Sequence, residues 1–371
     1  MSQLKVNTIR HTGASSDAVT LATDGTCTAK ITNQPPGNRN LVINGACNVA
    51  QRSTSAVTDD SYRTVDRFAL GYGGIDEHPT QERHALTSSD TGPWEKGFRH
   101  SFHVTNGNQT NGFGASDFFN IKYIVEAQDM ASSGWNYTSA SSYITLSFWV
   151  KSSVAQNFYG YIKSQDGTFK HYAFETGSLS ANTWTKITKT IPGHADITFN
   201  NDNGQGLIVE LIHYTGTTES GSVTLNQWAT FNGSLRTPDQ TSTWWTTNDA
   251  TIEVTGVQLE VGDVATDFEH RSYSDELARC QRYFEICADG RYGNLAGSGN
   301  FKIYTTFKTI KRASPTLTLL DSAENCVSSV TMGNFPGGIN SEVYGARIIG
   351  AVDSTGDNKY VDARFSADSE L

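Results

Sequence analysis

Residues 251–285 read TIEVTGVQLEVGDVATDFEHRSYSDELARCQRYFE, and two hydrophobic periods meet within them. From Ile252 to Val261 apolar residues alternate with polar ones, which is the period of a strand with one buried face. Gly256 interrupts the alternation, and a glycine inside a strand pattern is typical of a β-bulge. We therefore predict a strand here that leads straight into the next element of the chain.

A helical period follows this strand. Leu277, Cys280 and Phe284 fall on one face of a helix, and Ser274 is placed to cap its N-terminus. The pattern predicts a short linking helix over residues 274–286. Its apolar face is expected to pack at the seam between a large β domain and a smaller one, or on the axis of an oligomer.

The composition is that of a β protein. Charged residues make up 18% of the chain, below the roughly 25% usual in soluble domains, while aromatic residues reach 11% and glycines number 34. Aromatic side chains fit pleated sheets and glycine serves turns. Helical patterns are too few for an α/β enzyme. A net charge of -10 argues against nucleic acid or an anionic membrane as partner.

Short strand patterns recur through the middle of the chain. They cover residues 118–125, 143–150, 158–164, 171–175, 184–191 and 207–214. Their number and spacing predict a jelly-roll β-sandwich over residues 41–273. Further strand patterns with glycine-rich links predict a small C-terminal β domain over residues 287–371.

The first 40 residues contain few apolar side chains. Leu4, Val6 and Ile9 lie among polar residues and cannot form a core alone. We expect residues 1–40 to be an extended anchor, ordered by intertwining with identical copies or by docking on another protein. The alternative is a loose terminus.

The cysteines and the N-terminus bear on where the protein is made. The cysteines are Cys27, Cys47, Cys280, Cys287 and Cys326. Their odd number and spacing fit neither a disulfide framework nor a zinc site, and indicate buried thiols in a reducing cytoplasm. The sequence shows no signal-peptide pattern and no apolar run long enough for a membrane span. We expect synthesis in a cytoplasm and release by a route other than secretion.

Several motifs, taken in order, resemble the tail-fibre and receptor-binding proteins of tailed phages, especially those of cyanobacterial and other marine phages. The motifs are NLVINGA (40–46), AQR (50–52), YRTVDRF (62–68), ITLSFWVKSS (144–153), TGVQLEVG (255–262), ATDFEHRSY (265–273) and RCQRYF (279–284). The opening LKVNTI (4–9) is also similar to the start of such fibres. The likeness spans about residues 40–285 and is only loose beyond them.

This resemblance implies a homotrimeric fibre on the virion. The N-terminus, with Leu4, Val6 and Ile9, would attach to a tail adaptor, a nozzle or another virion protein. The jelly roll would form the body, and the distal end would meet a host-surface glycan or other receptor. Neither nucleic acid nor membrane insertion is implied, and synthesis in the host cytoplasm fits release by lysis.

Aromatic residues in loop-like segments are the candidate glycan-binding residues, because flat rings stack on the apolar faces of sugars. They are Trp94, Trp135, Tyr137, Trp244 and Trp245. In an extended chain the adjacent Trp244 and Trp245 would point opposite ways, so one would face solvent. Loop anchoring or a subunit interface is the alternative for each ring.

The sequence predicts no catalytic residue, no cofactor and no metal ligand set. Acidic residues that could supply paired carboxylates for glycoside hydrolysis are Asp59, Asp60, Glu77, Glu82, Asp263 and Asp267. They keep a polysaccharide depolymerase open as one alternative, and a structural virion appendage without receptor contact is another. His100 and His103 would face opposite sides of a strand, so they would not share a metal. Asp66 could hold a structural calcium ion or pair with an arginine.

Overall fold

The structure is a computed structural model, and it describes residues 6–10, 12–13, 18–21, 23, 27–29, 39–295, 299–324, 327–334, 343–352 and 356–371. Strands dominate the described chain. None of the helices in these residues is both long and apolar enough to cross a bilayer.

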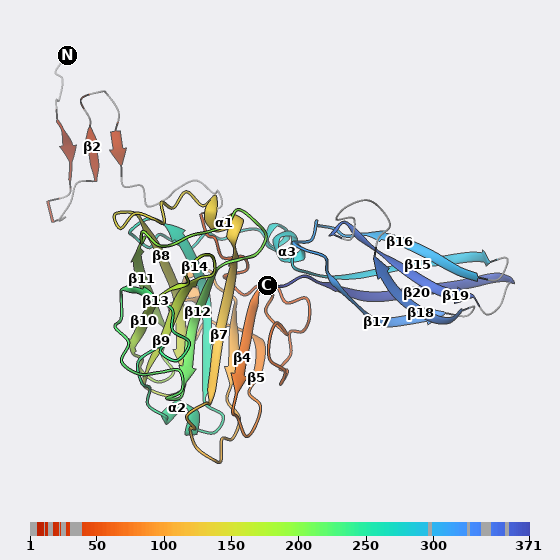
Figure 1. Cartoon of the computed structure of the whole chain (residues 1–371), viewed down its shortest axis with the longest axis horizontal. Helices are drawn as coiled ribbons and strands as arrows, with labels where there is room; N and C mark the ends of the chain where they lie inside the picture. Colours follow the sequence, from red (N-terminus) through yellow and green to blue (C-terminus); the bar gives the residue numbers. More distant parts are fainter. Residues whose placement is uncertain are drawn as a thin grey trace.

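Two antiparallel sheets form the body of the molecule (Figure 1). One sheet has six strands in the order β13 (Trp228–Thr230), β10 (Lys170–Ser178), β9 (Asn157–Ser164), β12 (Gln205–Thr215), β7 (Phe118–Glu126) and β4 (Phe68–Gly73). The other has five, in the order β11 (Thr185–Pro192), β8 (Tyr143–Ser152), β14 (Thr251–Val261), β6 (His100–Thr105) and β5 (Thr80–Ala85). The prediction of an all-β chain built around a β-sandwich is confirmed.

The core lies between the two sheets. One face of β8, made by Ile144, Leu146, Phe148 and Val150, is fully buried against residues of the six-stranded sheet. The strand predicted around Gly256 is β14, and its pairing with β8 shifts register between Thr255 and Gln258. Gly256 has a φ of 62°, a conformation that glycine adopts without strain. The bulge expected at this glycine is therefore present.

Trp244 and Trp245 lie in the short helix α2 (Thr243–Thr246) and not in an extended chain. Both side chains are 1% exposed. The Trp244 ring stacks on Phe119 at 4.5 Å between ring centroids, and the Trp245 Nε1–H donates to the Gly112 carbonyl at 2.8 Å. The expectation that one ring faces solvent is wrong, because the helical turn buries both against the end of the sandwich.

The linking helix is α3, which spans Tyr273–Gln281 and lies at the junction with the C-terminal domain (Figure 1). Its N-cap is Ser272 and not Ser274, because the Ser272 hydroxyl accepts the Asp275 N–H at 3.2 Å. Cys280 is buried, and Leu277 packs against the same small cluster. Phe284 is buried too, but it begins strand β15 and does not belong to the helix.

The C-terminal domain consists of two three-stranded sheets that extend away from the sandwich (Figure 1). The first has the order β15 (Phe284–Leu295), β20 (Gly356–Asp368) and β17 (Thr316–Glu324). The second has the order β16 (Gly299–Thr306), β19 (Gly345–Val352) and β18 (Val327–Asn334). The chain then returns to the junction, where its C-terminus lies.

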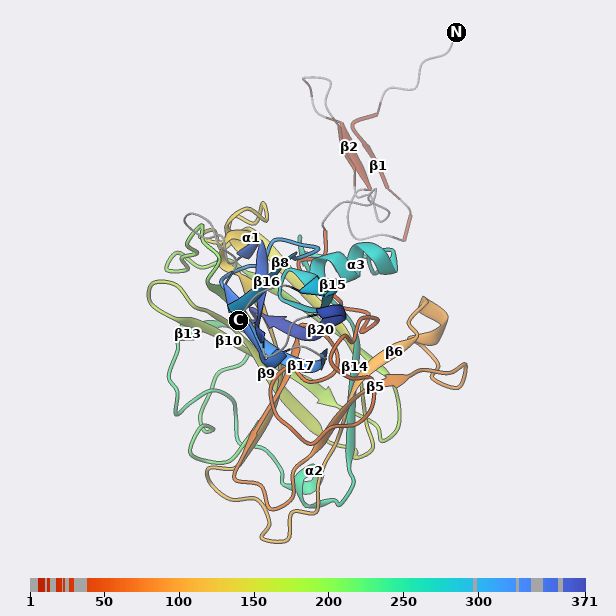
Figure 2. The same ribbon diagram turned by 90° about the vertical axis from the view of Figure 1, so that its right-hand side faces the viewer.

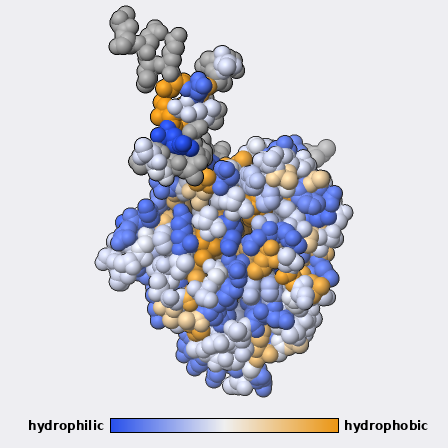
Figure 3. All heavy atoms as spheres, turned by 90° about the vertical axis from the view of Figure 1, so that its left-hand side faces the viewer, coloured by the Kyte–Doolittle hydropathy of each residue, from blue (hydrophilic) through white to orange (hydrophobic). Residues whose placement is uncertain are grey.

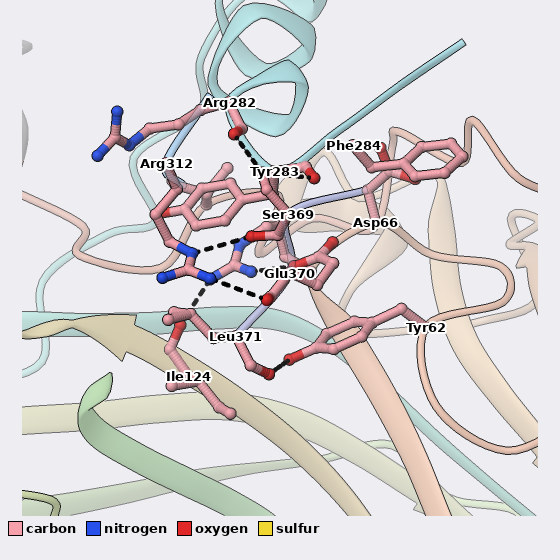
Figure 4. A network of polar contacts seen from close by, with 12 residues as sticks. Tyr62, Asp66, Ile124, Arg282, Tyr283, Phe284, Arg312, Ser369, Glu370 and Leu371 are labelled. Carbon is pink, nitrogen blue, oxygen red and sulfur yellow. Dashed lines mark hydrogen bonds and ion pairs between the residues drawn. The ribbon is translucent and has the colours of Figure 1, made fainter. Parts of the chain in front are cut away.

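A network of buried polar groups joins this domain to the sandwich (Figure 4). Arg67 is fully buried and forms an ion pair with Glu370 near the C-terminus. Its Nη2 also donates to the Ile124 carbonyl at 2.6 Å, and its guanidinium lies 3.4 Å from the centre of the Tyr283 ring. The Tyr62 hydroxyl completes the joint with a bond of 3.2 Å to the Leu371 carbonyl. The joint thus combines charge and hydrogen bonds with the small apolar cluster of Ile43, Val49, Cys280 and Tyr283.

The N-terminal strands form a separate three-stranded sheet of β1 (Thr8–Ile9), β2 (Val19–Leu21) and β3 (Cys27–Ala29). It projects from the body in both ribbon views (Figures 1 and 2). Val6, Ile9 and Leu21 are exposed there, and apolar spheres are visible on this arm in Figure 3. Leu4 lies outside the described residues.

Candidate functional site

A pocket of about 350 Å³ opens on the outer face of the five-stranded sheet. We call it the β14 pocket, and its lining residues are Glu95, Lys96, Phe98, Ser147, Trp149, Lys186, Gly256, Thr266, Asp267, Phe268 and His270. They come from β8, β11 and β14, from the 3-10 helix η1 (Trp94–Lys96) and the link between it and β6, and from the segment that follows β14. This size lies within the roughly 300–1,000 Å³ range of small-molecule sites.

Aromatic rings form the apolar part of the pocket. Phe98 and Phe268 meet edge to face, with 4.8 Å between ring centroids. His270 lies against both, and its Nε2 is 2.8 Å from the Lys96 carbonyl oxygen. Trp149 adds a half-buried indole from β8. Together the four rings provide the kind of surface on which the apolar face of a sugar packs.

The bulge in β14 makes room for this aromatic group. A Cβ at Gly256 would lie 2.6 Å from the Phe98 ring, so a larger residue would displace that ring. Gly92 has a similar role above Trp149, where a Cβ would come within 2.8 Å of the indole. Both glycines also have positive φ values, of 62° and 97°. The pocket therefore depends on glycine at both positions.

The wall after β14 is held by a buried carboxylate. Glu260 is 1% exposed and accepts the Thr266 N–H at 2.9 Å and the Thr266 hydroxyl at 2.6 Å. The Gln258 side chain accepts the Glu269 N–H at 2.8 Å. Arg39 donates to the Asp267 carbonyl at 2.5 Å from the opposite direction. These bonds fix the backbone beside Phe268 and leave the Asp267 side chain exposed.

The opposite wall, which carries η1, is anchored to β8 through Asp90. This carboxylate accepts from Lys151 at 2.9 Å and from the Trp184 indole at 3.0 Å. Burial alone would raise the pKa of Asp90. The hydrogen bonds from the Thr87 N–H, Trp184 and Lys151 outweigh burial and hold the pKa well below its usual value. Both walls of the pocket are thus preorganised.

The rim of the pocket is polar and carries charges of both signs. Glu95, Lys96, Lys186 and Asp267 are exposed, whereas Ser147 is 3% exposed and the Thr266 hydroxyl is already bonded to Glu260. Carboxylates accept hydrogen bonds and ammonium groups donate them, so this rim could bind the hydroxyls of a sugar whose ring lies on the aromatic floor.

The structure disperses the five aromatic residues that the sequence singled out. Trp135, Trp244 and Trp245 are buried in the core, which corrects their prediction as a sugar-binding surface. Trp94 lies in η1 beside the pocket, with the Arg99 guanidinium 3.8 Å from its ring centre. Tyr137 is half-buried and packs edge-on against Phe199. For Trp94 and Tyr137 a role in glycan binding stays a prediction.

Sequence reasoning named Asp267 but missed the aromatic residues that line the pocket. Phe268 and His270 alternate with Asp267 and Glu269 shortly after the β14 pattern. That alternation is the sequence signal that could have identified the two rings as neighbours on one face. Their partners Phe98 and Trp149 are distant in sequence, so only the sheet register brings the four rings together. Residues 251–285, for which the sequence predicts a strand and a linking helix, supply nearly half of the pocket lining.

The acidic residues weighed for hydrolysis are also dispersed. Asp267 lines the pocket, whereas Glu82 contacts two histidines on β5 and β6. Asp66 accepts two hydrogen bonds from Gln51 and lies 3.9 Å from Arg52. The arginine pairing expected for Asp66 is therefore present.

A larger groove of about 630 Å³ lies between the sandwich and the C-terminal domain, but its groups are engaged with each other. Arg52 covers the Phe284 ring, 3.6 Å from its centre. The same guanidinium pairs with Asp368 at 3.0 Å and with Glu370 at 3.5 Å. The β14 pocket is the better candidate because its rim charges are exposed and three of its rings, Trp149, Phe268 and His270, are at least partly exposed.

Comparisons with known proteins place the chain near no described family. No family model and no curated protein matches it. Solved structures similar to 60% of the chain include the enzymatically active domain of bacteriophage CBA120 tailspike protein 4, at 11% identity and a TM-score of 0.31. The match covers 22% of that tailspike chain.

Two carbohydrate-binding domains are similar over comparable lengths. The family 11 carbohydrate-binding module of a Clostridium thermocellum cellulase shares 12% identity, with 59% of this chain and 99% of the module covered and a TM-score of 0.27. The N-terminal cellulose-binding domain of Cellulomonas fimi β-1,4-glucanase C shares 7% identity, with 58% and 99% covered and a TM-score of 0.27. Likeness at this level carries no argument about function, which has to come from the pocket.

Proposed function

We propose that this protein is a receptor-binding protein of the phage tail-fibre type, and that its β14 pocket binds a host-surface glycan without cleaving it. The observation that carries this proposal is the pocket itself, in which aromatic rings form the floor and exposed charged groups form the rim. Sugars present the same two kinds of surface, an apolar ring face and an edge of hydroxyls.

The projecting N-terminal sheet supports an attachment role at the other end of the chain. Val6 and Ile9 are 38% and 56% exposed on the single chain, although apolar side chains are stabilised by burial. We propose that they pack against identical chains of a homotrimer and a protein of the virion. Three linked pockets would give strong attachment even where each single pocket binds weakly. Mass measurement in solution tests the trimer, and a stable monomer would contradict it.

The binding test uses oligosaccharides prepared from host-surface polysaccharide and the whole protein. Trp149→Ala and Phe268→Ala each remove a ring from the floor, and we expect roughly tenfold weaker binding from each. Asp267→Asn and Lys186→Gln change only exposed rim groups and keep the fold testable if a ring variant does not fold. Surface plasmon resonance or calorimetry gives the affinities.

Tyr344→Ala is the matched control, because Tyr344 is 51% exposed in the C-terminal domain, away from the pocket lining. Unchanged binding in this control together with losses in the pocket variants supports the proposal. If the wild-type protein binds the glycan and all four pocket variants bind it with the same affinity, the glycan binds elsewhere.

A reducing-sugar assay separates binding from depolymerisation. We expect no release of oligosaccharide from the host polysaccharide over long incubation. Release that Asp267→Asn abolishes would assign hydrolysis to this pocket and overturn the non-enzymatic proposal. Antibodies against the pocket, applied to intact virions, test whether the protein is instead a structural appendage without receptor contact. If it is such an appendage, the bound antibodies would not block adsorption to the host.

A further inference from the structure

Two histidines and a glutamate converge on the outer face of strands β5 and β6. Glu82 lies directly opposite His103 in the antiparallel pairing, and His84 is two residues farther along β5 on the same face. The three candidate donor atoms lie within 4.8 Å of one another. The cluster is therefore assembled by strand register, which a sheet holds more rigidly than a loop would.

Both histidine nitrogens lie close to one oxygen of Glu82. The Nδ1 atom of His103 is 2.8 Å from Glu82 Oε1, and the Nδ1 atom of His84 is 3.3 Å from the same oxygen. A tetrahedral zinc site with bonds of about 2.0–2.1 Å separates its nitrogen and oxygen donors by about 3.3 Å. Small side-chain rotations would thus place the three donors around one ion.

We propose that Glu82, His84 and His103 bind a divalent transition-metal ion of the zinc class. Two imidazoles and one carboxylate suit zinc and its neighbours better than calcium or magnesium, which prefer oxygen ligands. Three protein ligands leave a fourth position for water or another oxygen ligand. The ion would also tie edge strand β5 to β6.

Solvent exposure differs among the three side chains. The side chains of His84, Glu82 and His103 are 44%, 29% and 13% exposed, so exposure falls from β5 toward the inner strand. Among the described residues, the ion pairs of Glu82 are with these two histidines and not with a lysine or arginine. An ion can therefore enter beside His84 without displacing a cationic partner.

The test is titration of the whole protein, first stripped with a chelator, with zinc chloride against a chromophoric zinc indicator. We expect one ion per chain in the wild type. His84→Ala and His103→Ala should each weaken binding at least tenfold, and Glu82→Gln should weaken it measurably. His194→Ala is the control, because His194 is an exposed histidine outside the cluster, beside Asp196, and it should bind as the wild type does.

Folding and geometry are checked separately. The three side chains face away from core residues Phe102 and Val104, so circular dichroism should show every variant folded. Cobalt(II) should give the intense visible bands of a four-coordinate site in the wild type and lose them in His103→Ala. Zinc should raise the melting temperature of the wild type but not of His103→Ala. Absence of zinc binding in the wild type, or equal affinity in the folded ligand variants, would overturn the proposal.

Discussion

The sandwich and the C-terminal domain are both built from antiparallel strands, but they bury their side chains to different extents. In the sandwich, large residues from both sheets, such as Phe148 and Phe158, lose all contact with solvent in one cluster. In the described part of the C-terminal domain, the buried cluster holds Phe307 and Phe365 with smaller residues, three of them alanines. Leu320 remains 47% exposed there.

This difference shows what holds each domain in place. Apolar burial stabilises in proportion to its area, so the larger core of the sandwich contributes more of this stabilisation. The C-terminal domain has less, and its position relies on polar contacts at the joint. Two of these are the pairs Arg67–Glu370 and Arg282–Glu126, the second with contacts of 2.8 and 2.9 Å.

Arg67→Ala should break the joint and give the largest effect. It removes the nearer of the two arginines that pair with the carboxylate of Glu370, which is 6% exposed, and leaves only Arg52 at 3.5 Å. It also removes the stacking on Tyr283. Breaking a buried pair costs about 3–5 kcal/mol, and we expect a value near the upper end. Calorimetry should show an earlier transition for the C-terminal domain, followed by that of the sandwich.

Arg63→Ala is the control for this prediction. Arg63 pairs with Asp59 at 3.7 Å on the surface, where both side chains are about half exposed or more. Exposed pairs contribute about 1 kcal/mol or less. An equally small effect from Arg67→Ala would show that the joint does not hold the C-terminal domain.

Trp244→Ala should destabilise the sandwich by about 4 kcal/mol, because truncating a buried tryptophan removes its packing and leaves a cavity. Its ring stacks on Phe119 in the core, so glycan affinity of the folded fraction should match the wild type. Denaturant unfolding and binding assays measure the two effects. Lost glycan binding with unchanged stability would restore Trp244 as a sugar-contact residue.

The same residues show what the sequence could and could not reveal. Alternation identified β8 and β14, and Gly256 identified the bulge, because these signals are local. Trp244 and Trp245 stand among threonines and serines, and only long-range packing explains their burial. The pocket was missed for the same reason, since Phe98 and Phe268 meet through the register of strands far apart in sequence. His103 was weighed with His100 on its own strand, although its metal-binding partners lie on β5.

Asp66 should make the joint sensitive to pH. Burial is the main cause that raises the pKa of Asp66 from 3.8 to about 6, and Glu370 raises it further, while Arg52 and the hydrogen bonds from Gln51 oppose the shift. The folded protein therefore binds a proton that the unfolded chain releases between about pH 4 and 6. This contribution to stability is complete below pH 4 and is lost as pH rises through 6, by at most about 3 kcal/mol.

The comparison with Asp66→Asn isolates this contribution, because asparagine does not titrate. Between pH 4 and 6.5 the wild-type unfolding free energy should fall relative to that of Asp66→Asn. Other carboxylates affect the unfolding free energy of both proteins alike. One of them is Glu126, where burial raises the pKa but the hydrogen bonds and charge of Arg282 outweigh burial and lower it. A constant difference across this range would mean that Asp66 titrates as an ordinary aspartate.

Ser272→Ala should give the smallest effect and decide between two caps for α3. Ser272 accepts the Asp275 N–H, whereas Ser274 contacts only the Ser272 hydroxyl, at 3.1 Å. Loss of a serine N-cap costs about 1 kcal/mol, and Ser274→Ala should cost less than half of that. Because α3 lies at the joint, the loss should appear in the transition of the C-terminal domain and leave that of the sandwich in place. A larger loss of stability in Ser274→Ala than in Ser272→Ala would show that Ser274 is the N-cap. A shift of the sandwich transition would show that α3 belongs to the larger domain.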